Sequence, residues 1–399
     1  MPTWIIEPRD PLIVRDGRPF GPDPGARARS LAFPFPSTTT GGVRNRAGLH
    51  ADGSFDHAQS DRVKREVRVR GPLLVELYDD NGQSRVRWFA AAPADAFLLR
   101  TKWRDDVTVL RRVPLRAPSD AIYGAPDGDP LELVGLRRYH KEKPPVRTPQ
   151  FWYWDTFLAW LTTPQEGGRK LDELGLAGPT AEMRMHVSID ATTQTAFEGL
   201  LFQTNGLEFT SLDRRRLALA VSTEATFTHF KGGLVPLGGE RRLVAWRQID
   251  ASLPKCPDEL RTTIIRERAC RVVLLTPAYF AAGLRPSWLL TPHAGVATTL
   301  RAALVGRPEV VSGWDLAAER TDANGKVVRG APKPTRRLAP AGSVFFLSLP
   351  RDASDQAINS WIDSMWMQNV SDDSSSRDEG FGLAVLGTWS GDLVSMEVD

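Results

Sequence analysis

The sequence EPRDPLIVRDGRPF covers residues 7–20, near the start of the chain. Its apolar residues, Leu12–Val14, lie between two Arg-Asp pairs, Arg9-Asp10 and Arg15-Asp16, and Gly17 follows. An Asp that precedes Pro or Gly commonly accepts hydrogen bonds from nearby backbone in a turn. We therefore expect a short strand whose ends are braced by Asp10 and Asp16. A metal site is disfavoured, because an arginine next to each carboxylate would compete with a cation.

Length and composition indicate a multidomain protein without membrane segments. The chain has 399 residues, of which 41% are hydrophobic and 25% charged, which predicts about two folded domains. Two cysteines, Cys256 and Cys270, make neither a disulfide framework nor a metal-site spacing. The start of the chain has charges where a signal peptide needs an apolar run, and no stretch is long enough to span a bilayer. The expectation is a cytoplasmic protein with no membrane partner.

The net charge is only +3, but the arginines gather in short clusters such as VKREVRVR, LRRVPLR and GGERR. Local basic clusters in a nearly neutral chain are compatible with a groove that binds a polyanion. For any single cluster a solvated, salt-bridged surface is the more common explanation, so charge alone does not establish such a groove.

The pattern of elements predicts an α+β fold. A strand over residues 3–6 precedes a helix over residues 38–48, capped by Ser37-Thr38, and a strand-rich region with an Asn81-Gly82 hairpin follows. A second helix is expected over residues 151–161, and the best helix follows Ser354, with Ile358, Trp361, Ile362 and Met365 on one face. Strand, helix, strands, helix, strand occurs about twice, as in two tandem ferredoxin-like (RRM-like) domains with hairpin insertions. The predicted domains are 1–180, with inserted strands and a basic linker, and 181–399, ending in a glycine-rich loop and strand.

Motifs for catalysis and cofactors are not found. GxxxxGK[ST], GxGxxG before a helix and GxSxG are absent, and the six histidines show no zinc spacing, so we expect no cofactor and no metal. His186, within MRMHVSID, has two interpretations. It is either a general base for RNA cleavage or a hydrogen-bonded strand histidine, and the second is preferred.

Glycines next to basic residues are the remaining signal for ligand binding. Lys231 precedes Gly232-Gly233, Gly238-Gly239 precede Glu240, Arg241 and Arg242, and Gly380 and Gly382 flank Phe381 before the last strand. Glycine lets a backbone approach a ligand closely and leaves N–H groups free for phosphate oxygens.

Together these stretches resemble one family, the third subunit of the Cmr module of type III-B CRISPR effectors. The opening resembles its DPLxxRDGRPF motif, and MRMHVSIDATTQTAFEGLLFQTNGLEF (Met183–Phe209), VPLGGERRLVAW (Val235–Trp246) and the pair APAGSVFFL and EGFGLAVLGTW follow in the family's order. The matched segments span Glu7 to Trp389, with long unmatched stretches between them. Asp10, Asp16, Gly17, His186 and Glu240 belong to this signature.

The resemblance implies a RAMP protein of two ferredoxin-like domains that grips the 5′ repeat-derived tag of the CRISPR RNA. It also implies contacts with the large polymerase-domain subunit and the first backbone subunit, with target RNA nearby. Catalysis in such complexes resides in those partners, so the resemblance implies a subunit that is not an enzyme.

A single-stranded tag would be held by backbone contacts and stacking. The predicted RNA-binding residues are Arg15, Arg18, Arg44, Arg46, Lys231, Gly238, Gly239, Arg241, Arg242, Gly380 and Gly382. A second set, in the basic linker, is Arg137, Arg138, Lys141 and Lys143, where a solvated loop is an equal alternative. The basic segment Lys326–Arg337 is predicted to be a hairpin that reaches over guide or target.

Two alternatives stay open. One is a metal-independent RAMP endoribonuclease that processes repeat RNA with His186 as the base. The other is the equivalent subunit of a type III-A complex, against which the RDGRPF and HVSID segments argue.

Overall fold

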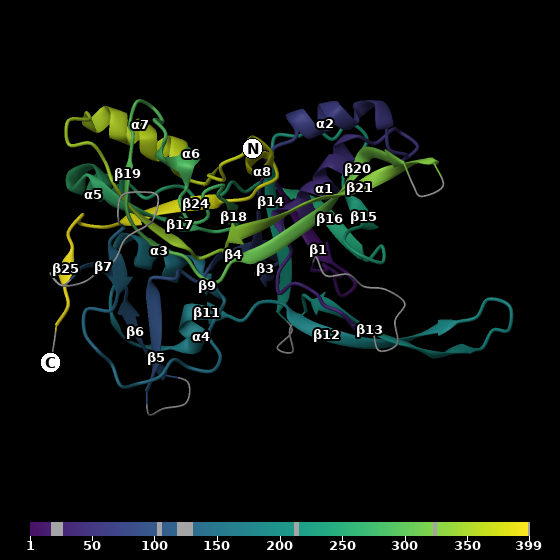
Figure 1. The fold of residues 1–399 in the computed structure, drawn as a ribbon, viewed down its shortest axis with the longest axis horizontal. Coiled ribbons are helices and arrows are strands. Elements are labelled where there is room, and N and C mark those ends of the chain that lie inside the picture. Colours follow the sequence, from purple (N-terminus) through teal and green to yellow (C-terminus); the bar gives the residue numbers. More distant parts are fainter. Residues whose placement is uncertain (17–26, 102–105, 118–130, 211–214, 322–324, 398–399) are drawn as a thin grey trace. The chain divides into compact units, whose positions relative to one another are not determined.

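The computed structural model describes residues 1–16, 27–101, 106–117, 131–210, 215–321 and 325–397. The chain forms two compact units, and each is assembled from three separate segments. Unit 1 comprises residues 1–86, 178–251 and 310–337, and unit 2 comprises residues 87–177, 252–309 and 338–399. The strands are largely antiparallel and combine with helices in both units, so the α+β class is confirmed (Figure 1).

Unit 1 is built on an antiparallel sheet. Its elements are β1 (Thr3–Pro8), β2 (Arg27–Ala28), α1 (Pro36–Ala47), the 3₁₀ helix η1 (His57–Gln59), α2 (Ser60–Glu66), β3 (Val69–Asp80), β12 (Thr180–Ile189), β13 (Ala196–Glu208), β14 (Arg216–Thr223), β15 (Gly233–Pro236) and β16 (Leu243–Ile249). Within this unit the sheet has the order β3-β14-β1-β16-β15, and β1 pairs antiparallel with both of its neighbours. The helix after the first strand, α1, contacts β3.

Unit 2 contains a second antiparallel sheet. Its elements are β5 (Ala96–Arg100), β6 (Asp106–Arg111), β7 (Val113–Arg116), β8 (Leu133–Gly135), β9 (Phe151–Tyr153), α3 (Trp154–Thr162), β10 (Gly167–Lys170), α4 (Leu171–Leu174), β11 (Gly175–Leu176), α5 (Asp258–Glu267), β17 (Ala269–Leu274), β18 (Ala278–Tyr279), α6 (Ser287–Leu290), β19 (Thr299–Leu304), β22 (Val344–Ser348), α7 (Asp355–Met365), β23 (Gln368–Asn369), α8 (Ser374–Asp378), β24 (Leu383–Thr388) and β25 (Val394–Ser395). The sheet has the order β19-β22-β17-β24-β23. Helices α5 and α7 contact each other and β24, so both cover the same face (Figure 1).

Four strands in each unit follow one order. Numbered along the chain within each unit, β1, β3, β14 and β16 lie as 2-3-1-4, and β17, β19, β22 and β24 lie in the same order. The pairs for which the register is defined are antiparallel in both sheets. This repeated strand order gives the two units a common sheet topology.

The units differ from the predicted division at residue 180. The first sheet is complete only at Ile249, because β14 and β16 pair on either side of β1. Helix α3, which the sequence places in the first domain, belongs to unit 2 together with α5 and α7. The physical reason is that strands distant in the chain supply the neighbours of β1, so the units interleave along the sequence.

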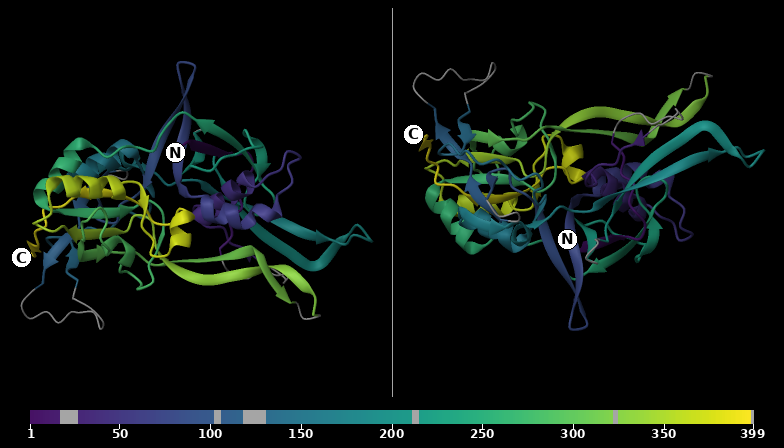
Figure 2. Two further views of the ribbon diagram at one scale, coloured as in Figure 1. Left: turned by 90° about the horizontal axis from the view of Figure 1, so that it is seen from above. Right: turned by 90° about the horizontal axis from the view of Figure 1, so that it is seen from below.

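Two long hairpins extend from unit 1 (Figure 2). One consists of β12 and β13, and the other of β20 (Glu309–Thr321) and β21 (Val327–Ala339), most of which belongs to unit 1. The expected basic hairpin around Lys326–Arg337 is therefore present. A third hairpin joins β3 to β4 (Gln83–Ala91) through Asn81 and Gly82, both with positive φ, as expected for this dipeptide.

Local signals predict some helix ends and miss others. Helix α7 follows the prediction: Ser354 Oγ accepts a hydrogen bond from Ala357 N at 3.2 Å, and the four expected apolar residues are buried. Helix α1 instead begins at Pro36, whose ring sets a helical φ, and no side chain caps it. The segment Phe151–Tyr153 forms strand β9 before α3 begins at Trp154, because it pairs with the end of β4.

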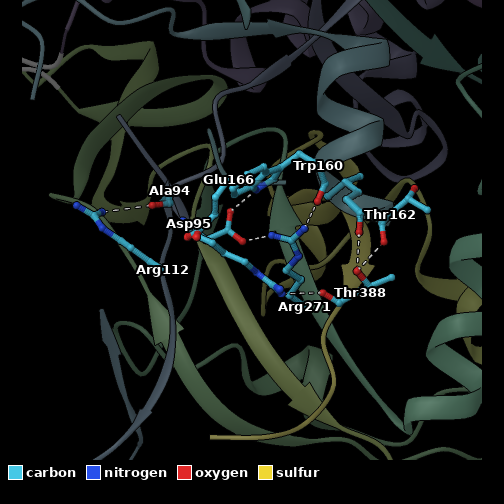
Figure 3. A network of polar contacts seen from close by, with 10 residues as sticks. Ala94, Asp95, Arg112, Trp160, Thr162, Glu166, Arg271 and Thr388 are labelled. Carbon is cyan, nitrogen blue, oxygen red and sulfur yellow. Dashed lines mark hydrogen bonds and ion pairs between the residues drawn. The ribbon is translucent and has the colours of Figure 1, made fainter. Parts of the chain in front are cut away.

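A buried ionic network lies in the core of unit 2 (Figure 3). Arg271, on β17, is fully buried and donates hydrogen bonds to the Asp95 carboxylate and to the carbonyl of Trp160. Trp160 Nε1 donates to the other oxygen of Asp95 at 3.0 Å. Burial lowers the pKa of Arg271 to about 9, so the guanidinium stays protonated at neutral pH and balances the carboxylate.

Both thiols are poorly reactive because burial disfavours the thiolate. Burial raises the pKa of Cys256 to about 11 and raises that of the fully buried Cys270 further. At pH 8 we expect Cys256 to react with a thiol reagent about a hundred times more slowly than a free cysteine, because the thiolate fraction falls about tenfold per pH unit below the pKa. Labelling rates measured from pH 7 to pH 11 should rise throughout this range. A rate that levels off near pH 8.5 would contradict the assignment.

Candidate nucleic-acid interface

Three of the motifs found in the sequence meet in unit 1. Leu12, from the opening stretch, exchanges two backbone hydrogen bonds with Leu207 on β13, each at 2.9 Å. Gly239, in the turn between β15 and β16, donates its N–H to the carbonyl oxygen of Ile13 at 2.7 Å. Residues distant in sequence therefore form one backbone structure, which we call the motif junction (residues 9–16, 205–209 and 237–243).

The opening stretch is also fixed to β16. Arg9 N donates to the carbonyl of Leu243 at 2.9 Å, and Leu243 N donates to Asp10 Oδ2 at 3.0 Å. Asp10 thus braces the loop through a backbone hydrogen bond, while the Arg9 guanidinium lies 3.5 Å from Glu7. At the other end, Asp16 N donates to the carbonyl of Arg29 at 3.1 Å. Gly17 and Arg18 lie outside the described residues.

The turn at residues 237–242 holds one arginine inward and leaves another exposed. Glu240 and Arg241 both have positive φ, 54° and 53°, which sets the direction of the turn. Glu240 forms an ion pair with Arg242 at 2.7 Å, and the Arg242 side chain is largely covered. Arg241 is exposed. Of the two adjacent arginines, Arg241 is therefore the one with a cation accessible to a ligand, and Glu240 acts through Arg242.

Gly238 and Gly239, within this turn, allow another segment of the chain to approach the backbone closely. A Cβ at Gly238, where φ is 74°, would lie 2.6 Å from the Ile13 carbonyl oxygen, and one at Gly239 would lie 3.0 Å from the Ile13 side chain. The close approach is to the chain's own opening strand. Because the Gly239 N–H is already donated to Ile13, it is not free for a phosphate oxygen.

Arg44 and Arg46, the predicted pair on the first helix, also differ in exposure. Arg46 is buried: it donates to the carbonyl of Pro236 at 2.9 Å, and its guanidinium lies 5.7 Å from the ring centroid of Phe230. Burial lowers its pKa. We remove Arg46 from the phosphate contacts, because its guanidinium is part of the interior of unit 1. Arg44 is partly exposed and donates to the carbonyl of Lys64 at 3.3 Å.

Gly380 and Gly382 are interior residues of unit 2. Gly380 N donates to the Arg377 carbonyl at 3.1 Å, and Gly382 N donates to the Pro277 carbonyl at 2.8 Å. Both residues are buried, and a Cβ at Gly382 would lie 2.8 Å from Ser371 N. Their N–H groups are used within the fold, which corrects their assignment to RNA binding. The positive φ of both glycines, 96° and 82°, explains why glycine occurs there.

The exposed cations occupy distinct places. Arg15 and Arg241 each lie two residues from the Ile13–Gly239 hydrogen bond, and because the pairing there is antiparallel they lie on opposite sides of it. Lys231 is exposed but precedes β15, at the end of the hairpin away from the turn. Arg137, Arg138, Lys141 and Lys143 are all exposed and belong to unit 2, where Arg137 pairs with Glu397 at 2.7 Å.

His186 has the environment of a structural strand residue. Its ring nitrogen Nε2 is 2.9 Å from Thr204 Oγ1, across the β12–β13 pair, and its ring stacks on Phe202 with centroids 5.2 Å apart. This agrees with the preferred interpretation of a hydrogen-bonded strand histidine. Leu207 and Leu243 complete the junction but are not among the predicted residues, since their contributions are backbone groups that sequence does not distinguish.

The described parts of the chain contain neither a cluster of potential metal ligands nor a helix that could span a membrane. In these parts no group of three or more His, Cys, Asp or Glu side chains is arranged to hold a metal ion. None of their helices combines the length and apolar character that crossing a bilayer requires.

The family model of the CRISPR-associated protein Cas_Cmr3 matches residues 4–389. The chain belongs to the Cas_Cmr3 family. The assignment made from the motifs, to the third subunit of the Cmr module, is thereby confirmed. The opening stretch, the β12–β13 hairpin and the GGERR turn of this Cas_Cmr3 protein all lie within the matched region.

Two solved structures are similar to the chain. They are cryo-EM structures of the type III-B Cmr-beta, one bound to cognate target RNA and AMPPnP and one bound to cognate target RNA. The identities are 16% and 14% and the TM-scores 0.43 and 0.45, with 86% of each chain covered in both comparisons. No curated protein sequence gives a significant match.

Proposed function

We propose that this protein is a non-catalytic, RNA-binding subunit of a type III-B CRISPR effector complex. It grips the 5′ tag of the CRISPR RNA and bridges the large polymerase-domain subunit to the backbone subunits. The observation that carries the proposal is the motif junction, in which backbone hydrogen bonds hold exposed Arg15 and Arg241 at fixed positions. Cations carried on a restrained backbone bind a phosphate backbone at a lower entropic cost than cations on a mobile segment.

The fold supports the same proposal. The 2-3-1-4 antiparallel strand order in both units is that of the ferredoxin-like βαββαβ arrangement, so we infer two tandem ferredoxin-like domains. Each unit departs from the regular pattern at one helix. Unit 1 has β15 where the second crossover helix would lie, and unit 2 has only the short α6 after its first strand.

Exposed apolar side chains support a role within an assembly. Along the edge strand β12, the alternate residues Met183, Met185, Val187 and Ile189 are exposed on one face. Isolated soluble proteins seldom leave such a stripe uncovered, and an unpaired edge strand invites association. These features suit protein partners, and the basic strand β21 suits nearby target RNA.

The endoribonuclease alternative is less well supported. A general base must accept a proton, but Nε2 of His186 lies at hydrogen-bonding distance from Thr204 and the ring stacks on Phe202. Incubating the protein with labelled repeat RNA in EDTA tests it directly. Site-specific cutting that is lost in His186→Ala would overturn the non-catalytic proposal. The type III-A alternative is disfavoured by the family match.

The tag-binding proposal predicts a salt-dependent effect of Arg241. Replacing it with Gln should lower the slope of log affinity against log salt by about 0.7, because one phosphate contact on a single strand is lost. The measurement is fluorescence anisotropy of the assembled complex with tag-bearing RNA at several salt concentrations. Arg65→Gln, which removes an exposed arginine of α2 outside the junction, is the matched control and should leave the slope unchanged.

The comparison that decides the proposal uses two RNAs that differ only in the tag. The complex should bind the tag-bearing RNA more tightly, and Arg241→Gln should reduce this preference. Equal affinity for the two RNAs would rule out tag recognition.

A further inference from the structure

Unit 2 presents an irregular basic segment that the tag-binding proposal does not use. Residues 136–150 connect β8 to β9 without forming a helix or strand, and we call them the basic strap. The segment reads LRRYHKEKPPVRTPQ and contains five Lys or Arg residues and one Glu. A connection of this length without regular structure is uncommon in a compact unit and is often functional.

The backbone of the strap is anchored at three points. Glu397 N donates to the Arg137 carbonyl at 2.8 Å, Arg100 N donates to the Lys143 carbonyl at 2.9 Å, and Gln150 N donates to the Leu176 carbonyl at 3.0 Å. Pro144 and Pro145 further restrict the chain between them to an extended conformation. The strap therefore displays its side chains on a restrained backbone.

Most of the positive charges of the strap lack an acidic partner among the described residues. Among the residues that the structure describes, Arg138, Lys141, Lys143 and Arg147 form no ion pair, and all four are exposed. Arg137 pairs with Glu397, and Glu142 lies 3.9 Å from His140. Four cations without acidic partners on one extended segment form a positive track.

An aromatic ring lies within this track. Tyr139 is 74% exposed, and it has no hydrogen bond or ring contact to any described residue. The neighbouring His140 side chain is only 16% exposed, so the strap has a covered side and an outer side. An exposed tyrosine flanked by cations is the combination that single-stranded nucleic-acid sites use: bases stack on the ring and cations contact phosphates.

We propose that the basic strap is a sequence-tolerant binding site for single-stranded RNA, in which Tyr139 stacks on an unpaired base and Arg138, Lys141 and Lys143 contact the phosphates. The site lies in unit 2 and does not recognise the tag. It can therefore be tested separately from tag recognition at the motif junction. An acidic protein surface would also attract the cations. The exposed, isolated ring favours RNA, because protein interfaces bury aromatic anchors in a cluster of apolar contacts, and within the strap only Val146 is similarly exposed.

The test is binding of the full-length protein to fluorescein-labelled, mixed-sequence single-stranded RNA without a tag. Tyr139→Ala should weaken binding about tenfold, since one base-stacking contact is lost, and Tyr139→Phe should bind like the wild type. Lys141→Gln should lower the salt slope by about 0.7. The matched control is Val146→Ser, which changes a 91% exposed residue of the same strap without touching charge or aromaticity and should have no effect.

Three results would overturn the inference. The first is wild-type affinity in Tyr139→Ala. The second is an equal loss of affinity for a matched RNA duplex, whose bases are unavailable for stacking. The third is that the strap variants keep their affinity for RNA but no longer associate with a partner protein. That result would assign the strap to an acidic protein surface. If tag preference is lacking but Tyr139→Ala still weakens tag-less binding, the strap site survives and the tag proposal fails.

Discussion

Replacing Arg271 with methionine is expected to lower the free energy of unfolding by about 3–5 kcal/mol, because it leaves the Asp95 carboxylate buried without its counter-charge. Arg271 and Asp95 are both fully buried, so water cannot replace the lost partner (Figure 3). Of its hydrogen bonds with described side chains, the carboxylate would retain only that from Trp160 Nε1, at 3.0 Å, and the Trp160 carbonyl would lose a donor. Urea unfolding monitored by tryptophan fluorescence measures the effect.

Two further variants separate charge from packing. The double variant Asp95→Leu with Arg271→Met should recover much of the loss, because a buried ion pair can often be replaced by apolar groups of similar volume. Arg266→Met removes an exposed arginine that forms an ion pair with its neighbour Glu267, and it should cost less than about 1 kcal/mol. A loss below about 1 kcal/mol for Arg271→Met would mean that the buried pair is not needed for stability.

Strand and helix positions could be predicted where the signal is local. The Asn81-Gly82 hairpin and α7 depend on neighbouring residues, and both are present where expected. The Phe151–Tyr153 strand depends on pairing with β4. The sequence there has the same helical pattern as α3, so a helix was predicted in place of the strand. The units differ from the predicted boundary for the same reason, since β1 finds its partners more than 200 residues away along the chain.

The motif junction could be predicted as a set of important stretches but not as a set of side-chain roles. Arg46 and Arg241 look alike in sequence, yet one is covered by Phe230 and Trp246 and the other is exposed. A glycine pair likewise predicts that another group comes close to the backbone, but it does not indicate which group. At Gly238 the neighbour is the backbone of Ile13. Tyr139 was missed because exposure of an aromatic ring has no local sequence signal.

Replacing Gly238 with alanine is expected to destabilise the protein by about 2–4 kcal/mol and to weaken tag binding. A non-glycine residue in the left-handed region costs about 1–2 kcal/mol, and the φ of 74° at this position is in that region. In addition, the new Cβ would lie 2.6 Å from the Ile13 carbonyl oxygen, a backbone atom that can move only if the opening stretch moves. Urea unfolding gives the stability, and anisotropy with tag-bearing RNA gives the affinity.

Gly53→Ala separates the two costs. Gly53 has a similar φ of 82°, but a Cβ there would meet nothing within 4 Å, so only the conformational cost of about 1–2 kcal/mol remains. The excess loss in Gly238→Ala then measures the contact between the GGERR turn and the opening stretch. If the two variants lose equal stability, that contact contributes nothing. If Gly238→Ala is the less stable but binds tag-bearing RNA like the wild type, the junction supports the fold without positioning Arg241, and the RNA contact must be sought elsewhere on the protein.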